Sequence, residues 1–357
     1  MEATIVAIVL AHSTETLIEE SLKSIKDHVD KILLIDTGVT DNTLQIAKKV
    51  VGLEKLVIRS WPWQNDYAVA RNKGLELAKN FGNWGIFIDT DMRYINAELI
   101  RPALEDVGNE EVLYVTADAG HIQSLIFRLP SSVLWEGRVH EAVNKPGKRM
   151  TISNVRVREV PKTKEQLIKK FTYTRDLLLQ ESETPRTLYY LADCYEGLGE
   201  SEKAIETFRR CSNLKGWNEE SAWACFRAGR LLCKHLRWEE ALEECGRGLT
   251  RHAGISELAW LAGYVSWAMG KIDQAIFWAK ISLVWADKAD VIGRIYFRDE
   301  QVLRTGPWDI LRFALRAVND ERGAQEAEEA YQAAMLFVSS SLLPTVNVPF
   351  PEKPSRC

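Results

Sequence analysis

The first half of the chain alternates between short apolar runs and segments with helical periodicity. The apolar runs have strand length and are nearly continuous rather than alternating, which is typical of parallel strands covered on both faces. Repeated strand-helix order predicts an α/β domain with a doubly wound, mostly parallel, Rossmann-like sheet. The predicted strands are 4–11, 31–35, 55–59 and 86–88, and the predicted helices are 12–25, 44–50 and 68–80.

Acidic residues follow the predicted strands at the points where those strands end. Asp36 comes directly after the second strand, and Asp89 and Asp91 come after the fourth. In sheets of this kind ligands bind at the carboxyl ends of the strands, so we expect the three carboxylates to share one edge. Asp89 and Asp91 are two residues apart, so in an extended segment both side chains point to the same side. Such a pair suits Mg²⁺ or Mn²⁺, although an Asp-x-Asp by itself is also ordinary turn chemistry.

The second half of the chain, from residue 185, has helix after helix and an internal repeat. Three short segments align at Ala204, Ala241 and Ala275, which are 37 and 34 residues apart. These spacings are close to the tetratricopeptide period of about 34 residues. A fourth, partial unit is predicted over 308–336, with Ala324 and Ala327 as its small residues. Helix pairs of this kind stack into a solenoid because each pair cannot bury its apolar face alone.

These patterns divide the chain into an α/β domain, a helical repeat domain and a tail. The predicted bounds are 1–160, 161–340 and 341–357. The tail is rich in Ser and Pro and lacks periodicity, so we expect it to be mobile.

Composition excludes several classes of protein. The 46 basic residues nearly balance the 50 acidic ones, and the net charge of −4 gives no global positive field for nucleic acid or membrane. The first apolar run, Ala3–Ala11, is too short to span a bilayer, so we expect no membrane span and a cytoplasmic protein. The 6 cysteines contain no Cys-x-x-Cys pair, which favours buried thiols over disulfides or a zinc site.

The glycine-rich loops that usually hold phosphates are missing. The sequence contains neither Gly-x-Gly-x-x-Gly nor Gly-x-x-x-x-Gly-Lys-Ser/Thr. An acidic edge repels a diphosphate unless a cation bridges the two. The pattern therefore favours a metal-dependent nucleotide-sugar site over an NAD-dependent dehydrogenase.

Four short motifs, in order along the chain, carry a resemblance to a known family. The chain resembles family 2 glycosyltransferases with the GT-A fold, and as a whole it looks like bacterial and viral glycosyltransferases with tetratricopeptide-like C-terminal regions. The motifs are Asp36-Thr37-Gly38-x-Thr40-Asp41-x-Thr43, Asp66-Tyr67-Ala68-x-Ala70-Arg71-Asn72, Ile88-Asp89-Thr90-Asp91 and Gly137-Arg138-Val139-His140-Glu141.

The resemblance implies a hexosyl or pentosyl transfer from a nucleotide-diphosphate sugar, with inversion at the anomeric carbon. It implies that Asp36 contacts the base or ribose, that Arg71 lies near the diphosphate, and that Asp89 and Asp91 hold the ribose and an Mn²⁺ or Mg²⁺ ion. Ala11, Asp41 and Asp66 complete the expected nucleotide-sugar-binding residues.

The sequence departs from the family pattern at three places. The first loop reads Ala11-His12-Ser13-Thr14-Glu15 where a basic residue, Asn and Glu are common, Val39 replaces the usual Ser, and Met92 follows the paired Asp where an acid is frequent. The first departure leaves the nucleotide open, with a UDP-sugar favoured. The third removes one candidate carboxylate.

A predicted loop over 131–141 carries the remaining candidates for chemistry. His140 as a neutral imidazole would complete a metal-ligand set with Asp89 and Asp91, and the alternative is a histidine that bonds a neighbouring loop. Glu141 is the candidate general base that takes the proton of the acceptor hydroxyl. Asp118 and Glu136 are alternatives for this role.

Residues 145–175 form a basic stretch. It is interpreted either as a solvated linker with the first helical face, or as a surface for an anionic acceptor. The acceptor itself stays open among a glycan, a protein or peptide, and hydroxymethylated DNA. Many of the 12 tryptophans lie in the repeat region, where most are expected in the core and a few are candidates for a stacking surface.

A second hypothesis assigns the function to the repeats. The repeat region would then bind a protein partner, and the α/β domain would be a degenerate scaffold. Met92 and the altered first loop are its support.

Overall fold

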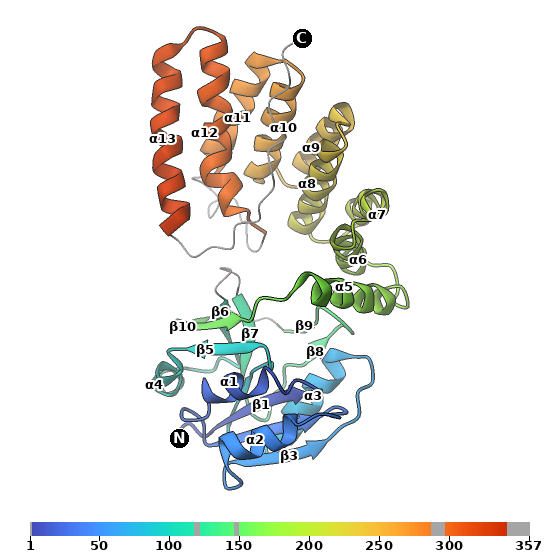
Figure 1. The fold of residues 1–357 in the computed structure, drawn as a ribbon, viewed down its shortest axis with the longest axis vertical. Coiled ribbons are helices and arrows are strands. Elements are labelled where there is room, and N and C mark those ends of the chain that lie inside the picture. The colour runs from blue at the N-terminus through green and yellow to red at the C-terminus, as the bar shows by residue number, and fades with distance from the viewer. Residues whose placement is uncertain (1, 118–121, 146–149, 287–296, 341–357) are drawn as a thin grey trace. The chain divides into compact units, whose positions relative to one another are not determined.

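The computed structural model describes residues 2–117, 122–145, 150–286 and 297–340, with the side chains of 300 and 338–340 left aside (Figure 1). The chain divides into two compact units, Met1–Thr163 and Lys164–Cys357. The predicted tail, 341–357, lies outside the described residues. Among the described helices, none combines the length and the apolar character that crossing a membrane requires.

The first unit is built on an eight-stranded mixed sheet with the order β3-β2-β1-β4-β7-β6-β10-β5. Parallel pairing joins β3, β2, β1 and β4 and also joins β6 to β10, whereas β7 and β5 run antiparallel to their neighbours. The strands are β1 (Ile5–Ala11), β2 (Lys31–Asp36), β3 (Leu56–Ser60), β4 (Trp84–Phe87), β5 (Met92–Ile95), β6 (Val112–Ala117), β7 (Ile122–Arg128) and β10 (Thr151–Glu159), with β8 (Trp135–Glu136) and β9 (Ala142–Val143) in a separate ribbon.

The first three helices of this unit connect the parallel strands, as the predicted α/β architecture requires, and the last two lie between β5 and β6. They are α1 (Ile18–Lys23), α2 (Thr43–Val51), α3 (Tyr67–Ala78), the 3₁₀ turn η1 (Ala97–Leu99) and α4 (Ile100–Glu105). Gly74 lets α3 approach the sheet closely, because a Cβ at this residue would lie 2.8 Å from Ile8 Cγ2 and 3.3 Å from Ile35 Cδ1. The register of the parallel strands sets Ala11 beside Asp36 and Ile8 beside Phe87. The carboxyl ends of β1, β2 and β4 therefore meet at one edge.

Two expectations about the first unit were wrong. The helix predicted to start at residues 12–15 begins only at Ile18, because the Thr14 and Glu15 N–H groups donate to Thr43 Oγ1 and Asp41 Oδ2 instead. The stretch 145–175, interpreted as a linker and a helical face, contains the sheet strand β10, followed by helix α5 (Lys164–Leu178). Ile152, Val155 and Val157 are the buried residues of β10.

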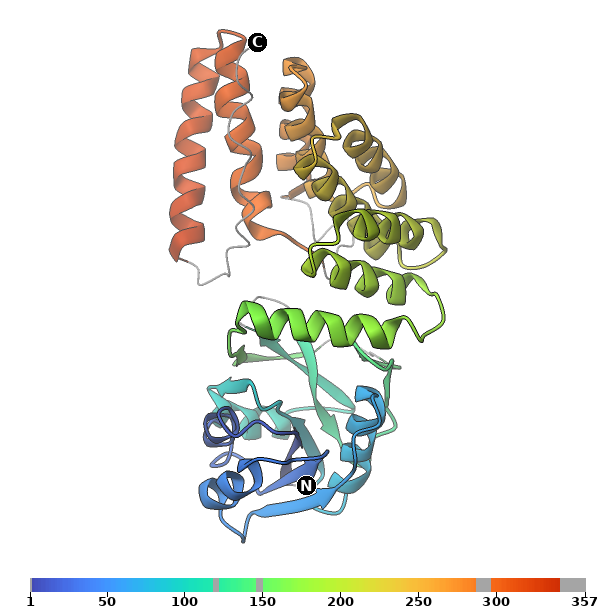
Figure 2. The ribbon, with the colours of Figure 1, turned by 45° about the vertical axis from the view of Figure 1, so that its right-hand side comes forward.

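Within its described residues, the second unit comprises α5 followed by four helical hairpins, which follow one another as antiparallel helices in Figure 2. The predicted repeat is confirmed by the turn inside each hairpin. Gly199, Leu236, Gly270 and Asn319 all have positive φ, from 58° to 79°. The helices are α6 (Pro185–Gly197) with α7 (Ser201–Asn213), α8 (Asn218–Lys234) with α9 (Trp238–Arg251), α10 (Ser256–Ala268) with α11 (Ile272–Ala286), and α12 (Glu300–Ala317) with α13 (Glu321–Ser340).

The aligned alanines of the repeat occupy equivalent buried places. Ala204, Ala241, Ala275 and Ala324 are each 0% exposed, and each lies five residues after the turn residue of its hairpin. A small side chain is needed there because the two helices of a hairpin approach closely. The fourth unit predicted over 308–336 is therefore a complete hairpin with the same turn.

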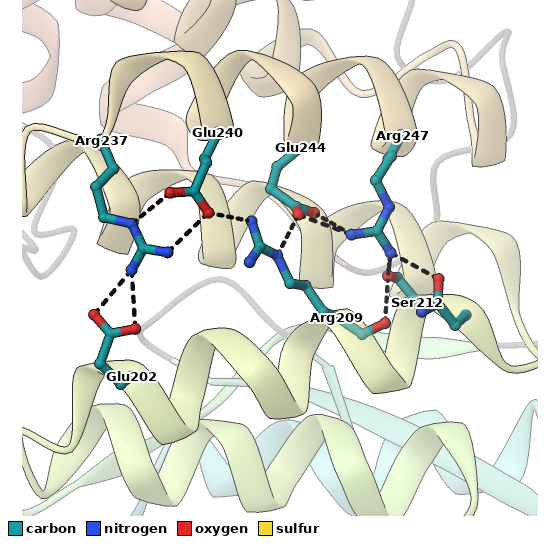
Figure 3. Close-up of polar contacts among 8 residues, drawn as sticks. Glu202, Arg209, Ser212, Arg237, Glu240, Glu244 and Arg247 are labelled. Carbon is teal, nitrogen blue, oxygen red and sulfur yellow. Dashed lines mark hydrogen bonds and ion pairs between the residues drawn. The ribbon is translucent and has the colours of Figure 1, made fainter.

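A ladder of ion pairs joins α7 to α9, the second helices of two successive hairpins (Figure 3). Arg237 donates to both oxygens of Glu202 at 2.9 Å. Arg209 donates to Glu244 at 2.7 Å and to Glu240 at 3.1 Å. The paired residues are 31 to 35 residues apart in sequence, so the ladder follows the repeat period.

Candidate active site

The turn after β4 holds Asp89 and Asp91 in a defined backbone. Met92 N–H donates to the Asp89 carbonyl at 2.9 Å, and Ser21 Oγ donates to the same carbonyl at 3.0 Å. The Arg93 guanidinium donates to the carbonyls of Thr90 at 3.0 Å and Leu17 at 2.9 Å. Contacts from α1 and from β5 therefore orient this turn before any ligand is bound.

Arg71 is the centre of the candidate site. Its Nη1 and Nη2 atoms donate to Asp89 Oδ1 at 3.2 Å and Oδ2 at 3.0 Å, and its Nε donates to Glu141 Oε1 at 2.6 Å. The guanidinium lies over the rings of Phe87 and Trp135, 5.2 and 5.3 Å from their centroids. Burial lowers the pKa of Arg71, but the two carboxylates outweigh burial and hold that pKa above the ordinary value for arginine.

The helix that carries Arg71 also fixes the loop that carries Glu141. Asp66 caps α3 by accepting from Val69 N–H at 2.9 Å. Asn72 exchanges two hydrogen bonds with the backbone of Trp135, at 2.8 and 2.9 Å. Tyr67 N–H donates to the Arg138 carbonyl at 2.9 Å. The second motif thus organises the loop that carries the fourth motif, through contacts to residues 63 to 71 positions later in the chain.

Asp91 has a partner of its own. Lys162 Nζ donates to Asp91 Oδ2 at 2.6 Å, and the side chains are 27% and 24% exposed. The two residues meet because β10 pairs antiparallel with β5, with Glu159 beside Met92, and because Val160 N–H donates to the Asp91 carbonyl at 2.8 Å. Burial lowers the pKa of Lys162, but the bond and the charge of Asp91 outweigh burial and raise it overall.

The other predicted nucleotide-binding residues lie at or near the ends of β1 and β2, or cap a helix. Asp36 Oδ1 accepts from the N–H groups of Gly38 at 2.9 Å and Val39 at 2.8 Å. The Ala11 carbonyl accepts from Thr37 N–H at 2.9 Å and Thr37 Oγ1 at 2.8 Å. Asp41 accepts from the backbone N–H of Thr43 at 3.0 Å, at the start of α2. Asp66 therefore caps α3, whereas Asp41 lies just before α2 and holds the turn that leads into it.

The structure brings some predicted residues together and keeps others apart. Asp89 and Glu141 share Arg71, as described above. The described residues contain no group of three or more His, Cys, Asp or Glu side chains placed to hold a metal, so Asp89, Asp91 and His140 do not form the expected ligand set. His140 has a left-handed backbone, with φ of 51°. Glu136 lies exposed in β8, and Asp118 lies outside the described residues.

Asp91 still fits a divalent cation of the hard type. Mg²⁺ commonly binds proteins through one or two carboxylates, with water and substrate phosphates supplying the other oxygens. Asp91 offers such a carboxylate at the carboxyl edge of the sheet, provided that Lys162 gives up its bond. Asp89 has both oxygens bonded to Arg71, so it is less available as a ligand.

Sequence reasoning missed Lys162, Asn72 and Trp135 as parts of this site. Lys162 was noted only as one member of the basic stretch. Asn72 was noted only as the last residue of the second motif. Asn72 and its partner Trp135 are 63 residues apart, and Lys162 and its partner Asp91 are 71 residues apart. No spacing in the sequence indicates contacts over such separations.

Residues 6–153 match the family model described as "Glycosyl transferase family 2". The first unit contains a family 2 glycosyltransferase domain. The matched range includes the four motifs, the Arg71 cluster and the first three residues of β10.

Two curated relatives each match part of the chain. The SPbeta prophage-derived glycosyltransferase SunS of Bacillus subtilis is 27% identical over 238 residues, which are 61% of this chain and 55% of SunS. A TPR repeat-containing protein of Synechococcus elongatus is 27% identical over 185 residues, 48% of this chain and 42% of the relative. The chain thus spans about half the length of the curated relatives it matches.

Among solved structures, MamA is 15% identical with a TM-score of 0.39, over 49% of this chain and 92% of MamA. BtubC from P. vanneervenii is 15% identical with a TM-score of 0.40, over 54% of this chain and 81% of BtubC. The evidence for the internal repeat of the second unit is the set of equivalent hairpins and turns in its own structure.

Proposed function

We propose that the protein is a metal-dependent, inverting glycosyltransferase that moves a sugar from a UDP-sugar to an acceptor hydroxyl. The observation that carries the proposal is the cluster in which Arg71 binds Asp89 and Glu141 beside Asp91, within a family 2 glycosyltransferase domain. The acceptor class stays open among a glycan, a protein and modified DNA.

The donor nucleotide is assigned to the edge where β1 and β2 end. Asp36 Oδ1 is used by the turn that follows it, while Oδ2 has no hydrogen bond to the described residues and is assigned to the base or ribose. Gly38 has φ of +121°, a conformation that disfavours larger residues, so the turn keeps its backbone close to the edge. His12 packs against this turn, with its Cε1 3.5 Å from the place of a Cβ on Gly38.

The diphosphate is assigned to the region of Asp91 and Lys162. Asp91 would hold Mg²⁺ or Mn²⁺, which neutralises the negative charge that develops on the leaving diphosphate. Arg71 gives three of its five N–H groups to Asp89 and Glu141, so we assign it the role of positioning those carboxylates. This differs from the expectation that Arg71 contacts the diphosphate itself.

Glu141 is the proposed general base. Its Oε1 is bonded to Arg71, and its Oε2 has no hydrogen bond to the described residues, so Oε2 takes the proton of the acceptor hydroxyl. The acceptor oxygen then bonds to the anomeric carbon while the bond from that carbon to the diphosphate oxygen breaks. The electron pair of that bond leaves with the UDP.

Release of UDP from UDP-sugars tests the proposal. Wild-type protein is expected to release UDP from at least one UDP-sugar with Mn²⁺ or Mg²⁺ and to stop when EDTA is added. Asp91→Asn is expected to lose at least about 100-fold in rate, by analogy with the loss of one electrostatic group at a transition state. Asp27→Asn, the same change at an exposed residue of the first unit, should keep the wild-type rate.

A second candidate function is protein binding through the repeats with an inactive first unit. The pairing of Asp91 with Lys162 favours it, because the carboxylate is neutralised without a metal. Binding of UDP to the protein in the presence of Mn²⁺ would argue against this candidate, and failure to bind any of the UDP-, GDP- or dTDP-sugars would support it.

A further inference from the structure

We propose that Lys162 is a built-in counter-cation for Asp91, which a divalent ion displaces and which then binds the diphosphate of the donor. The proposal rests on the proposed function for the identity of the donor. It adds a binding residue that the four motifs do not contain. It also assigns a reason for the basic residue at the end of β10.

The position of Lys162 is fixed by the sheet. The antiparallel pair β5–β10 ends with Glu159 beside Met92, and the next backbone bond joins Val160 N–H to the Asp91 carbonyl at 2.8 Å. Pro161 restricts the backbone of the segment that follows. Lys162 therefore reaches Asp91 from a backbone that is held on two sides, unlike a lysine on an exposed helix.

The contact is also tight and partly desolvated. The Nζ–Oδ2 distance is 2.6 Å, and about three quarters of each side chain is covered. By contrast, Lys169 and Glu165 on α5 form a pair in which the side chains are 76% and 78% exposed. Partial burial strengthens the attraction between opposite charges, so the Lys162 ammonium holds Asp91 against a competing cation.

The charges of the cluster explain why the Asp91 carboxylate needs a positive partner both with and without a bound metal ion. Asp89, Asp91 and Glu141 carry three negative charges, and Arg71 satisfies two of the three carboxylates. Asp91 would be left without a partner among the described residues if Lys162 were absent. Lys162 and a divalent ion are thus alternative partners for one carboxylate.

This exchange couples metal binding to donor binding. A metal that takes Asp91 releases an ammonium group close to the place assigned to the diphosphate. An ammonium group is an ordinary phosphate ligand, so the released Lys162 stabilises the donor. By linkage, the donor must then tighten metal binding by the same factor as the metal tightens donor binding.

Removing the ammonium group tests the exchange. The dissociation constant of Mn²⁺ is measured by electron paramagnetic resonance of the free ion, without nucleotide and with UDP. Lys162→Met is expected to bind Mn²⁺ about tenfold more tightly than wild type without nucleotide, because a competing charge is gone. Lys145→Met, an exposed lysine of the first unit, is expected to match wild type.

Three further variants keep the test decisive. Lys162→Gln removes the charge and keeps a polar side chain, and it should show the same gain if Lys162→Met folds poorly. Lys162→Arg keeps the charge and should show no gain. Combining Lys162→Met with Asp91→Asn should abolish the gain, because the metal would lose its carboxylate.

The results separate this inference from the proposed function. Equal Mn²⁺ affinity in wild type and in both neutral variants would overturn the inference, even if UDP release still required metal. Tighter Mn²⁺ binding in the neutral variants would support it, even if no UDP-sugar were turned over. The factor by which UDP tightens Mn²⁺ binding should be smaller in Lys162→Met than in wild type, and an unchanged factor would contradict the second step.

Discussion

The two units of this protein use arginine–carboxylate pairs in different ways. In the second unit the pairs are spread along α7 and α9, where Glu202 and Glu240 are 72% and 37% exposed. In the first unit Arg71 is 9% exposed and its partners come from the end of β4 and from a distant loop. The ladder joins two successive repeats. The convergence of two carboxylates on the buried guanidinium of Arg71 instead marks the candidate active site.

The comparison shows that the number of ion pairs is a poor guide to function. Exposed pairs contribute little because water and salt screen them. A buried pair is costly to form and very costly to break, so it persists where position matters. Glu244 of the ladder is the intermediate case, because it is buried but has two arginines, Arg209 and Arg247.

Removal of Arg71 is expected to give the largest effect. Arg71→Met leaves Asp89 and Glu141 facing each other without their cation, so the first unit should lose about 3–5 kcal/mol of unfolding free energy in urea. The matched change Arg209→Met in the ladder should cost clearly less, because Glu244 keeps Arg247. Equal losses in the two variants would remove the distinction between site and ladder.

Loss of Asn72 should give the next largest effect. Asn72→Ala removes two hydrogen bonds to the backbone of Trp135, and we expect a loss of about 1–3 kcal/mol in the first unit. Hydrogen exchange of the amides in 131–141 should become faster, since this loop would lose its attachment to α3. Asn80→Ala, which removes a bond on the exposed end of α3, should leave that exchange unchanged.

A change in a turn of the repeats should stabilise the second unit. Leu236 has φ of 58°, and its side chain is 64% exposed, so it contributes strain and little packing. Leu236→Gly is expected to raise the unfolding free energy by about 1 kcal/mol, measured by urea titration of tryptophan fluorescence. The reverse change, Gly270→Leu, should lower it, and a loss of stability in Leu236→Gly would show that the leucine packs usefully.

The smallest effect is expected from the pH dependence of the ladder. Hydrogen bonds from Arg237 and Arg209 lower the pKa of Glu240 to about 2, compared with 4.5 for a free glutamate. Because the folded pKa is the lower one, the stabilisation is complete above about pH 5 and is lost as the pH falls towards about 2. The difference in urea midpoint between wild type and Glu240→Gln should therefore be constant at neutral pH and shrink below about pH 4.5. If the difference in urea midpoint stayed constant at all pH values, the lowered pKa of Glu240 could not be its cause.

The sequence predicts the parts of the fold that depend on regular patterns. Continuous apolar runs predicted β1 to β4, and the spacing of Ala204, Ala241 and Ala275 predicted the hairpins. Strand β10 escaped because its pattern is irregular: Ile152 and Val155 are three residues apart, and Asn154 between them has φ of 66°. The register with β6 shifts in the same segment, so the two-residue period of a strand is interrupted there.

The candidate site was predicted in its residue types and only partly in its contacts. Motif order placed Asp36, Asp89 and Asp91 at strand ends, which the register of β1, β2 and β4 explains. The partners of those carboxylates depend on how distant segments meet. Arg71 comes from α3 and Lys162 from the end of β10, so the pairing appears only when the sheet is assembled.

The central claim is that Asp91 and its neighbours form a donor site that needs a divalent ion. Titration calorimetry of UDP into wild type and Asp91→Asn, each with Mn²⁺ and with EDTA, tests it most directly. We predict that wild type binds UDP tightly only with Mn²⁺, and that Asp91→Asn shows no gain from the metal. Tight binding of UDP to both proteins in EDTA, or no binding to either with Mn²⁺, would contradict the claim.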